Sequence, residues 1–441
     1  MRVLISGAGI AGNALAFWLS RQGHSVTVVE RFPSLRASGL QVDLRGHGVE
    51  VLRRMGLEAA FLAKKAPEQG IEVVDKHGRR RGFFPSNNLS QLAEPGKPRV
   101  QNFTSDYEIM RGDLCQLLFG AAKKANATFV FGKSIRGFTD GDDSVEVNFS
   151  DGTTYRYDLL VGADGQRSAT RRLLFGQAIE DACYHPFQDT YMAYFTIPRP
   201  IKPGEGYVGS IFIATNRRGI MTRRHAEDEL QVYIGCNSRD GRLEEARRGG
   251  DVPEQKKIWA EIFDGAGWKT EEVMQALRDT ESDIYVETPA LVKLDRWSKG
   301  RVALVGDAAW CPTPTTGVGT TCAMIGAYVL AGEMAKHCRI DRGPEKGDLA
   351  MALKGFEDKF MPYMAEIQRG VPVENGGESL TGRIIATSFG ISLFHLAVSV
   401  ASGLNLNLGR WFLKEDVVKG WDLDEYRAVE GMDVASGEHG E

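Results

Sequence analysis

The sequence has 441 residues, of which 42% are hydrophobic and 25% are charged. This is the composition of an ordinary globular protein with two or three domains, and it excludes disordered and fibrous proteins. The 54 basic and 58 acidic residues give a formal net charge of −4 and are interspersed, so no nucleic-acid partner is expected.

Cysteine and histidine spacing gives no sign of a metal site. The six cysteines form no CxxC pair, and the eight histidines form no HxxxH or HExxH. We therefore expect no bound metal, and cysteines that are reduced and mostly buried.

The first thirty residues predict a strand, a glycine turn, a helix and a second strand. Arg2–Ser6 and Ser25–Glu30 are β-rich apolar runs, and Ile10–Arg21 has apolar side chains at helical spacing. A right-handed crossover would lay the two strands parallel, with the turn at the carboxyl end of the first. Because the N-terminal apolar run enters a glycine motif directly, it is not a secretion signal, and we expect a cytoplasmic protein.

The turn carries a GxGxxG motif with an acidic residue at the end of the next strand. Gly7 permits a tight turn, Gly9 lets a pyrophosphate approach the backbone, and Gly12 allows close helix packing, while the helix N-terminus favours a phosphate. Glu30 would accept hydrogen bonds from an adenosine ribose. The alternative is a glycine turn without a ligand. The residues assigned to the dinucleotide here are Gly7, Gly9, Ile10, Ala11, Gly12, Glu30 and Arg31.

The rest of the chain begins with further helices and strands. Short alternating strands follow in the middle, and a buried strand and a helix come after them. Helices are expected over Val49–Leu57 and Arg111–Lys124, and strands over Thr128–Phe131, Val145–Phe149 and Leu159–Gly162. Between Tyr184 and Tyr285 short alternating strands such as Ser210–Ala214 and Gln231–Cys236, with a helix over Pro253–Phe263, predict an antiparallel sheet. A buried strand at Arg301–Gly306 and a helix over Thr320–His337 follow.

Two further motifs point to a flavin. The segment Leu159–Ser168 (LLVGADGQRS), with Arg171 after it, and the segment Arg301–Ala309 (RVALVGDAA) resemble the "DG" and "GD" motifs of class A flavoprotein monooxygenases of the para-hydroxybenzoate hydroxylase type. With the glycine motif, they stand in that family's order over roughly residues 1 to 360. The closest similarity is to the tetracycline-inactivating and polyketide-hydroxylating branch.

The resemblance implies an α/β fold in which a discontinuous Rossmann-like FAD-binding domain carries an inserted, mainly antiparallel β substrate domain and a C-terminal helical segment. We expect the FAD domain at residues 1–75, 102–180 and 284–362, the substrate domain at 76–101 and 181–283, and the helical segment at 363–441. The small, polar tail from Gly431 is expected to be disordered.

The resemblance also assigns flavin contacts around the GD motif. Asp307 would accept from the ribityl hydroxyls, although capping a helix is an alternative role. The loop before the next helix presents backbone N–H groups that can stabilise a reduced flavin anion, at Gly317, Val318, Gly319 and Thr320. Many relatives have Asn after this loop's last glycine and Asp in the helix, where this chain has Thr320, Thr321 and Gly326.

Four charged residues, with Arg171 as a fifth beside one of them, complete the predicted cofactor set. By resemblance, Arg111 binds the ribityl-phosphate region, Asp43 touches FAD, and Arg36 recruits the nicotinamide phosphate. Asp164, with Arg171, braces the flavin and nicotinamide sites. Surface or strand-to-helix roles are the alternatives for these side chains.

The implied function is an FAD-dependent monooxygenase, reduced by NADPH or NADH, that hydroxylates an aromatic or polyketide-like molecule with dioxygen through a flavin hydroperoxide. Met221 and Arg223 are the candidate substrate contacts, in a strand-like run that also contains His225. Beyond the flavin we assign no catalytic residue. The protein is expected to be a monomer or a homodimer.

The same fold also supports different functions. A halogenase is disfavoured because none of the seven tryptophans forms a WxWxIP segment. A flavin reductase of isoprenoid chains and a catalytically silent flavin-binding subunit both stay open. The residues from 384 to 409 contain no Asp, Glu, Lys or Arg. We expect them to pack on the protein's own domains, with a membrane or partner contact as the less favoured interpretation.

Overall fold

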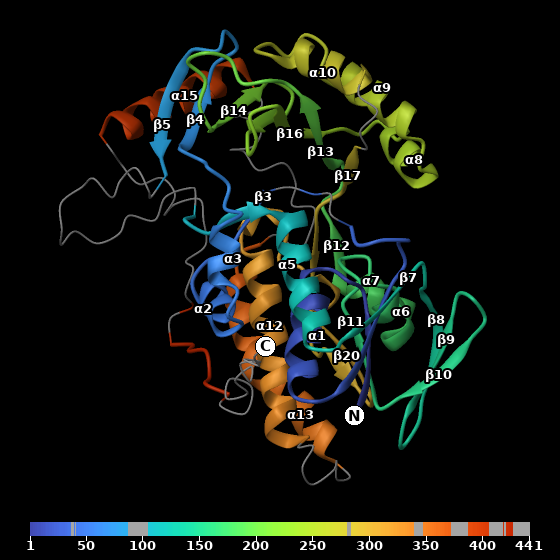
Figure 1. Cartoon of the computed structure of the whole chain (residues 1–441). Coiled ribbons are helices and arrows are strands. Elements are labelled where there is room, and N and C mark those ends of the chain that lie inside the picture. Colours follow the sequence, from blue (N-terminus) through green and yellow to red (C-terminus); the bar gives the residue numbers. More distant parts are fainter. Residues whose placement is uncertain are drawn as a thin grey trace, which may run out of the picture.

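A mostly parallel six-stranded sheet of order β19-β20-β11-β1-β2-β7 organises the lower body of the molecule (Figure 1). The computed structural model describes residues 1–36, 39, 41–86, 105–279, 284–338, 347–371, 387–404, 418 and 420–426. Only the short β19 runs antiparallel to its neighbour. The strands are β1 Arg2–Ser6, β2 Ser25–Glu30, β7 Thr128–Phe131, β11 Leu159–Gly162, β19 Ser298–Lys299 and β20 Val302–Leu304.

Helices and a three-stranded antiparallel sheet surround this sheet. The largely buried α12 packs on α1, α2 and α13, and α1 also packs on α5. The helices are α1 Ile10–Arg21, α2 His47–Arg54, α3 Glu58–Leu62, α5 Arg111–Lys124, α6 Ala169–Phe175, α7 Gln177–Cys183, α11 Asp307–Trp310, α12 Gly319–His337 and α13 Asp348–Ile367. The small sheet consists of β8 Ile135–Asp140, β9 Val145–Phe149 and β10 Thr154–Tyr157, and its apolar side chains join the same core.

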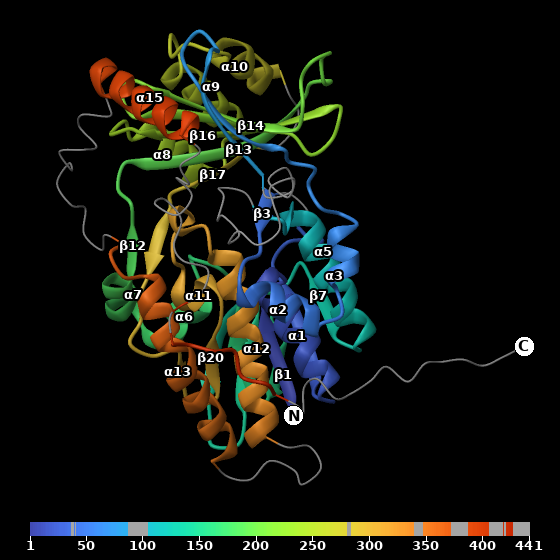
Figure 2. The same ribbon diagram turned by 90° about the vertical axis from the view of Figure 1, so that its left-hand side faces the viewer.

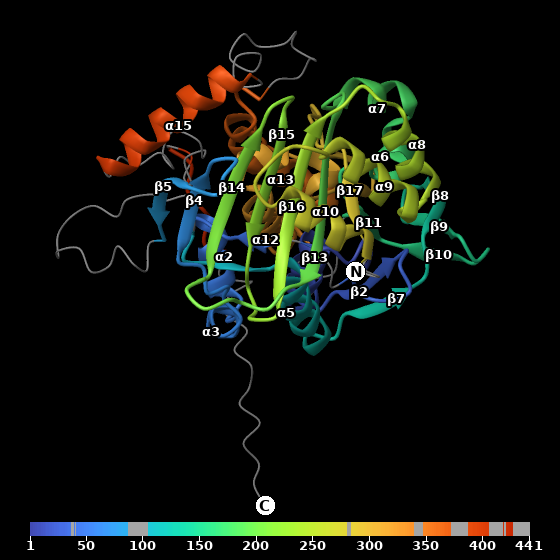
Figure 3. The same ribbon diagram turned by 90° about the horizontal axis from the view of Figure 1, so that it is seen from above.

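A second, seven-stranded sheet of order β17-β13-β16-β15-β14-β4-β5 lies above this body (Figures 1 and 2). It is antiparallel except where β14 pairs with β4. Its strands are β4 Gly70–Val74, β5 Arg80–Pro85, β13 Thr190–Pro198, β14 Val208–Ala214, β15 Arg218–Arg223, β16 Glu229–Asn237 and β17 Tyr285–Glu287. One face is covered by α8 Arg242–Gly249, α9 Val252–Ile262 and α10 Thr270–Asp279 (Figure 3).

Two short ribbons join the two bodies. They pair β3 Gln41–Asp43 with β6 Glu108–Met110, and β12 Tyr184–Pro186 with β18 Ala290–Val292. The domain boundaries expected after residue 75 and before residue 284 would put β4 and β17 in the FAD domain. In the structure both strands belong to the second sheet. Each joins the rest of that sheet through a strand far away in the sequence, β14 for β4 and β13 for β17, so local pattern does not reveal the pairing.

Most expected elements are confirmed. The strands β1, β2, β7, β9 and β11 and the helices α1 and α5 have the predicted bounds, and the α/β fold with an inserted, mainly antiparallel sheet is present. The helix expected over Val49–Leu57 instead spans His47–Arg54, since Gly56 adopts a left-handed φ of 71° that ends it. All six cysteines are free and buried.

The C-terminal region contributes the end of α13 and a separate helix, α15 Ser388–Gly403, which packs on β5 (Figure 3). Among the described helices, none is long and apolar enough to cross a membrane. The tail expected to be disordered from Gly431 lies outside the described residues, as do the ends of the uncharged segment 384–409.

An aromatic cluster holds α11 in place beneath the sheet edge. The ring centroids of Trp310 and Trp297 lie 4.6 Å apart, and Phe356 of α13 lies 5.4 Å from Trp297 and 6.0 Å from Trp310. All three side chains are almost completely buried. The cluster therefore fixes the short helix that begins with Asp307.

Phe356→Ala should lower the free energy of unfolding by about 3–5 kcal/mol, because it leaves a cavity among these rings. Chemical denaturation followed by fluorescence measures this change. Met351→Ala on the same helix is the control, since Met351 is 50% exposed and its truncation should cost less than about 0.5 kcal/mol. Equal losses in the two variants would contradict the packing described.

Candidate active site

In the glycine turn between β1 and α1, two glycines leave no room for a side chain and the third lies beside open space. A Cβ added to Gly7, whose φ is +111°, would lie 2.5 Å from the carbonyl oxygen of Ala163, and one added to Gly12 would overlap the carbonyl oxygen of Gly7. Around Gly9, in contrast, nothing lies within 4 Å of an added Cβ. Gly9 is the N-cap residue of α1 and has no side chain that could occupy the end of the helix. The turn therefore presents open backbone at a helix N-terminus, where a phosphate fits.

Glu30 fastens this turn from the end of β2. Its carboxylate accepts hydrogen bonds from the backbone N–H of Ala8 at 2.9 Å and of Phe32 at 3.1 Å. Ile10 and Ala11 are buried, whereas the neighbouring Arg31 is exposed and lies over the ring of Phe32. Glu30 is thus already fixed beside the open backbone, with further lone pairs available to a ribose.

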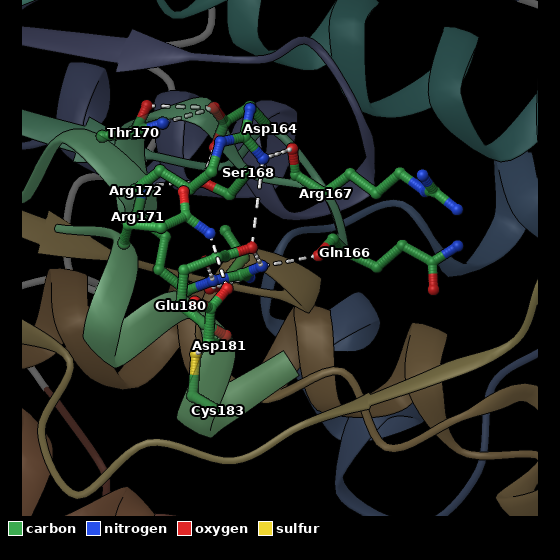
Figure 4. A network of polar contacts seen from close by, with 12 residues as sticks. Asp164, Gln166, Arg167, Ser168, Thr170, Arg171, Arg172, Glu180, Asp181 and Cys183 are labelled. Carbon is green, nitrogen blue, oxygen red and sulfur yellow. Dashed lines mark hydrogen bonds and ion pairs between the residues drawn. The ribbon is translucent and has the colours of Figure 1, made fainter. Parts of the chain in front are cut away.

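The DG motif is built around two side chains (Figure 4). Asp164, after β11, accepts from the backbone N–H and the hydroxyl of Thr170, both at 3.0 Å, and from the hydroxyl of Ser168. Asp164 therefore ties β11 to the start of α6, which is the strand-to-helix role that the sequence also allowed.

Arg171 is completely buried and links this motif to the GD motif. It donates to both carboxylate oxygens of Glu180 at 2.7 and 2.8 Å and to the carbonyl oxygen of Gln166 at 2.8 Å (Figure 4). Its Nη1 also donates to the carbonyl oxygen of Ala308 at 2.9 Å. Arg171 thereby holds the residue that follows Asp307, which is 136 positions away in the sequence.

Asp307 begins α11, directly after the Gly306 turn that follows β20. The residue is exposed to solvent, yet desolvation by the surrounding protein, reinforced by the charge of Glu287, raises its pKa to about 6. Gly306, just before Asp307, packs closely on the start of α1, because a Cβ added to it would lie 2.7 Å from the Cβ of Ala11.

The loop after α11 delivers a second helix N-terminus to the same region. It contains the short 3-10 helix Pro314–Thr316, turns at Gly317 with a φ of 68°, and enters α12 at Gly319. Val318, the cap residue, contributes no capping side chain. The backbone N–H groups of Gly319 and Thr320 are therefore in the first turn of a buried helix, as predicted from the sequence.

Thr321, in the first turn of α12, links this helix to the segment of Asp43. Its hydroxyl accepts from the backbone N–H of Arg45 at 3.0 Å, and the Arg45 side chain binds Asp43 at 2.5 Å. The chain of contacts fixes Asp43 relative to the N-terminus of α12. Thr321 is therefore a neutral link between two predicted cofactor segments.

Arg111 and Arg36 bring positive charge to the region around Asp307. Arg111 begins α5, its side chain lies against Gly39, and its charge partly opposes the rise that burial causes in the pKa of Asp307 and of Glu287. The guanidinium of Arg36 lies 4.4 Å from the ring centroid of Tyr285 in β17. Both arginines thus face the junction between the FAD-binding body and the second sheet.

The second sheet turns its uncovered face toward this junction. Strand alternation places Ala193, Phe195, Ile220, Val232 and Ile234 against α8–α10, so their neighbours point the other way. Five of those neighbours are half-buried and largely apolar: Met192, Ile211, Ile213, Met221 and Tyr233. Met221, a predicted substrate contact, is therefore part of an apolar surface.

Arg223, the other predicted substrate contact, is buried in an ion-pair network. It binds Glu68 at 2.5 Å and Glu108 at 2.6 Å, and Gln41 also donates to Glu108 at 2.6 Å. Burial raises the pKa of Glu108 to about 7, against the opposing effect of Arg223. The network joins β15 to the β3–β6 ribbon, so the side chain already has two carboxylate partners. His225, after β15, is half-buried and bonded to Gln231.

A carboxylate that the sequence did not reveal stands at the edge of this face. Glu287 accepts from the hydroxyl of Tyr194 at 2.9 Å and from that of Tyr285 at 3.2 Å. Burial raises its pKa. No motif marked Glu287, because it becomes notable only when β17 pairs with β13 and brings it near Asp307.

The residues present fit an FAD molecule. The open backbone at Gly9 and the N-terminus of α1 would hold the pyrophosphate, Glu30 the ribose, and the exposed carboxylate of Asp307 the ribityl chain, with the N-terminus of α12 as a further N–H donor group.

Sequence comparison decides the family. Residues 1–348 match the model of the FAD binding domain family. The FAD-dependent monooxygenase asL4 of Sarocladium schorii is 47% identical over 435 residues, which cover 97% of this chain and 98% of that protein. The chain belongs to the class A FAD-dependent monooxygenases.

Other relatives place this monooxygenase more closely. The flavin-dependent monooxygenase eupH of Phoma sp is 40% identical over 376 residues, covering 82% of this chain and 84% of that protein. The structure of tetracycline destructase Tet(51) aligns with a TM-score of 0.68 and 26% identity over 96% of this chain and 98% of that one. These matches support the tetracycline-destructase type of branch, and they favour an oxidoreductase over a silent subunit.

Asp307→Ala should lower the affinity of the apoprotein for FAD by roughly 10- to 100-fold, because it removes a charged acceptor from the ribityl position. The affinity of the unmodified protein should also fall as the pH drops through about 6, since the carboxyl then becomes protonated. Flavin fluorescence titration measures both effects.

Asp358→Ala is the matched control, because Asp358 is an exposed carboxylate on α13 paired with Lys354. It should leave FAD affinity unchanged. An Asp307→Ala protein that retains the full flavin content would show that Asp307 has no part in the cofactor site.

Proposed function

We propose that this monooxygenase hydroxylates an apolar aromatic or polyketide-like molecule, with NADPH or NADH as the electron donor and dioxygen as the co-substrate. The observation that carries the proposal is the half-buried apolar face of the second sheet, opposite the predicted flavin site. Met192, Ile211, Ile213, Met221 and Tyr233 would contact such a substrate. Bound FAD would supply electron transfer and oxygen activation.

The protein's own contribution is positioning and exclusion of water. The apolar face would desolvate the substrate and hold it against the flavin edge. The Arg223 network would fix this face relative to the β3–β6 ribbon, since its two ion pairs join elements of both bodies. Glu287 could accept a hydrogen bond from a substrate hydroxyl, because its raised pKa makes the carboxylate a better proton acceptor.

Two features support the remaining parts of the proposal. The guanidinium of Arg36 lies on the aromatic ring of Tyr285 at the junction. The guanidinium would bind a phosphate of a nicotinamide nucleotide, and the aromatic ring would pack on one of the nucleotide's rings. The name of tetracycline destructase Tet(51) identifies tetracycline, a fused-ring compound, as what that protein acts on. A role in secondary metabolism or antibiotic modification is consistent with such a substrate.

The proposed activity predicts substrate-stimulated NADPH oxidation, equal oxygen uptake, and a product that has gained one oxygen atom. A panel of hydroxylated aromatic and polyketide-like compounds, followed by absorbance, an oxygen electrode and mass spectrometry, tests this. Met221→Glu should lower kcat/KM by about 10-fold or more with FAD content unchanged, because it places a charge on the apolar face.

Leu173→Glu is the control, since Leu173 is a 43% exposed leucine on α6, away from this face. Reduction of a panel compound without oxygen incorporation would favour the reductase alternative. Equal turnover by the Met221→Glu protein would remove the apolar face from the substrate site.

A further inference from the structure

The helix α15 carries a continuous stripe of exposed apolar side chains. Phe389, Leu393, Leu396, Val400 and Leu404 follow one another at intervals of four, three, four and four residues and are 51–76% exposed. This spacing places them on one side of the helix. We call these five residues the outer stripe; monomeric surfaces seldom expose so many large apolar side chains together.

The opposite side of α15 is fixed to β5, so the helix cannot rotate to bury the stripe. The hydroxyl of Ser399 donates to the carbonyl oxygen of Arg81 at 2.7 Å, and the backbone N–H of Phe83 donates to the hydroxyl of Ser402 at 3.0 Å. Val398 packs so closely on Gly82 that a Cβ there would lie 2.7 Å from it. Figures 1 and 3 show α15 along the outer edge of the second sheet.

A basic hairpin lies beside the helix. The turn between β4 and β5 exposes Lys76 and Arg79, and the start of β5 adds the exposed Arg80 and the half-buried Arg81. Only Asp75 and Glu72 oppose them, so residues 72–81 carry a net charge of +2 in a protein whose overall charge is −4. In contrast, α15 has no Asp, Glu, Lys or Arg at all.

We propose that the outer stripe and the β4–β5 hairpin dock this enzyme on an anionic lipid surface. An uncharged helix can enter the boundary between headgroups and acyl chains without desolvating a charge, while the neighbouring arginines bind lipid phosphates. With 16 residues and one face held on β5, α15 would lie on the bilayer and not cross it. A second copy of the chain fits less well, because pairing two stripes would bring two basic hairpins together.

The test is co-sedimentation of the flavin-loaded full-length enzyme with vesicles of phosphatidylcholine alone or with about one third phosphatidylserine. We expect binding to the anionic vesicles, weakened by salt. Leu396→Glu combined with Val400→Glu should reduce binding by at least about 10-fold, and Arg80→Gln by about 5-fold.

Matched controls are Met351→Glu, a methionine 50% exposed on α13, and Arg156→Gln, an exposed arginine paired with Glu146; both should bind like the unmodified enzyme. FAD content and circular dichroism establish that each variant is folded, with Leu393→Ser as a milder replacement for the double variant.

Three results would overturn the proposal. They are an unmodified enzyme that stays in the supernatant with every vesicle, binding that survives the double variant, and a dimer in light scattering that the double variant converts to a monomer. The last result would assign the stripe to a second copy. None of these outcomes depends on the identity of the substrate.

Discussion

The buried guanidinium of Arg171 is the contact on which the predicted cofactor site depends. A charge without solvent is costly unless hydrogen-bond partners replace water, and Arg171 donates four hydrogen bonds: two to Glu180 and one each to the carbonyl oxygens of Gln166 and Ala308. Two of these partners belong to the DG region and one to the GD motif. Removing Arg171 would therefore take away the two short hydrogen bonds of Glu180 and release the backbone that carries Asp307.

The same principle operates between the two bodies. Arg223 lies between Glu68 and Glu108, and its side chain is as inaccessible as that of a core residue. Burial, reinforced by the charge of Glu68 and opposed by that of Arg223, raises the pKa of Glu108 to about 7. The distance between the apolar face and the flavin site is thus set by ion pairs, which are directional, and not by apolar packing alone.

Local pattern predicted the parts of the fold that local forces determine. The β1–α1–β2 unit and α5 were predicted residue for residue, because apolar periodicity and glycine turns act over a few positions. The second sheet's membership was not, since β4 and β17 join it through partners more than 90 residues away. The same limit applies to side chains: Glu287 near Asp307 and Glu108 beside Arg223 are products of strand pairing, which no motif records.

We propose that Arg171 acts on the cofactor through the segment that carries Asp307, because it binds the carbonyl oxygen of Ala308. A double-mutant cycle with Arg171→Lys and Asp307→Asn, read as FAD affinity by fluorescence titration, tests it most directly. If the two residues act together, the double variant loses less affinity than the sum of the single losses, by about 1 kcal/mol or more. Losses that add to within about 0.5 kcal/mol would contradict the claim and leave Arg171 with a separate structural role.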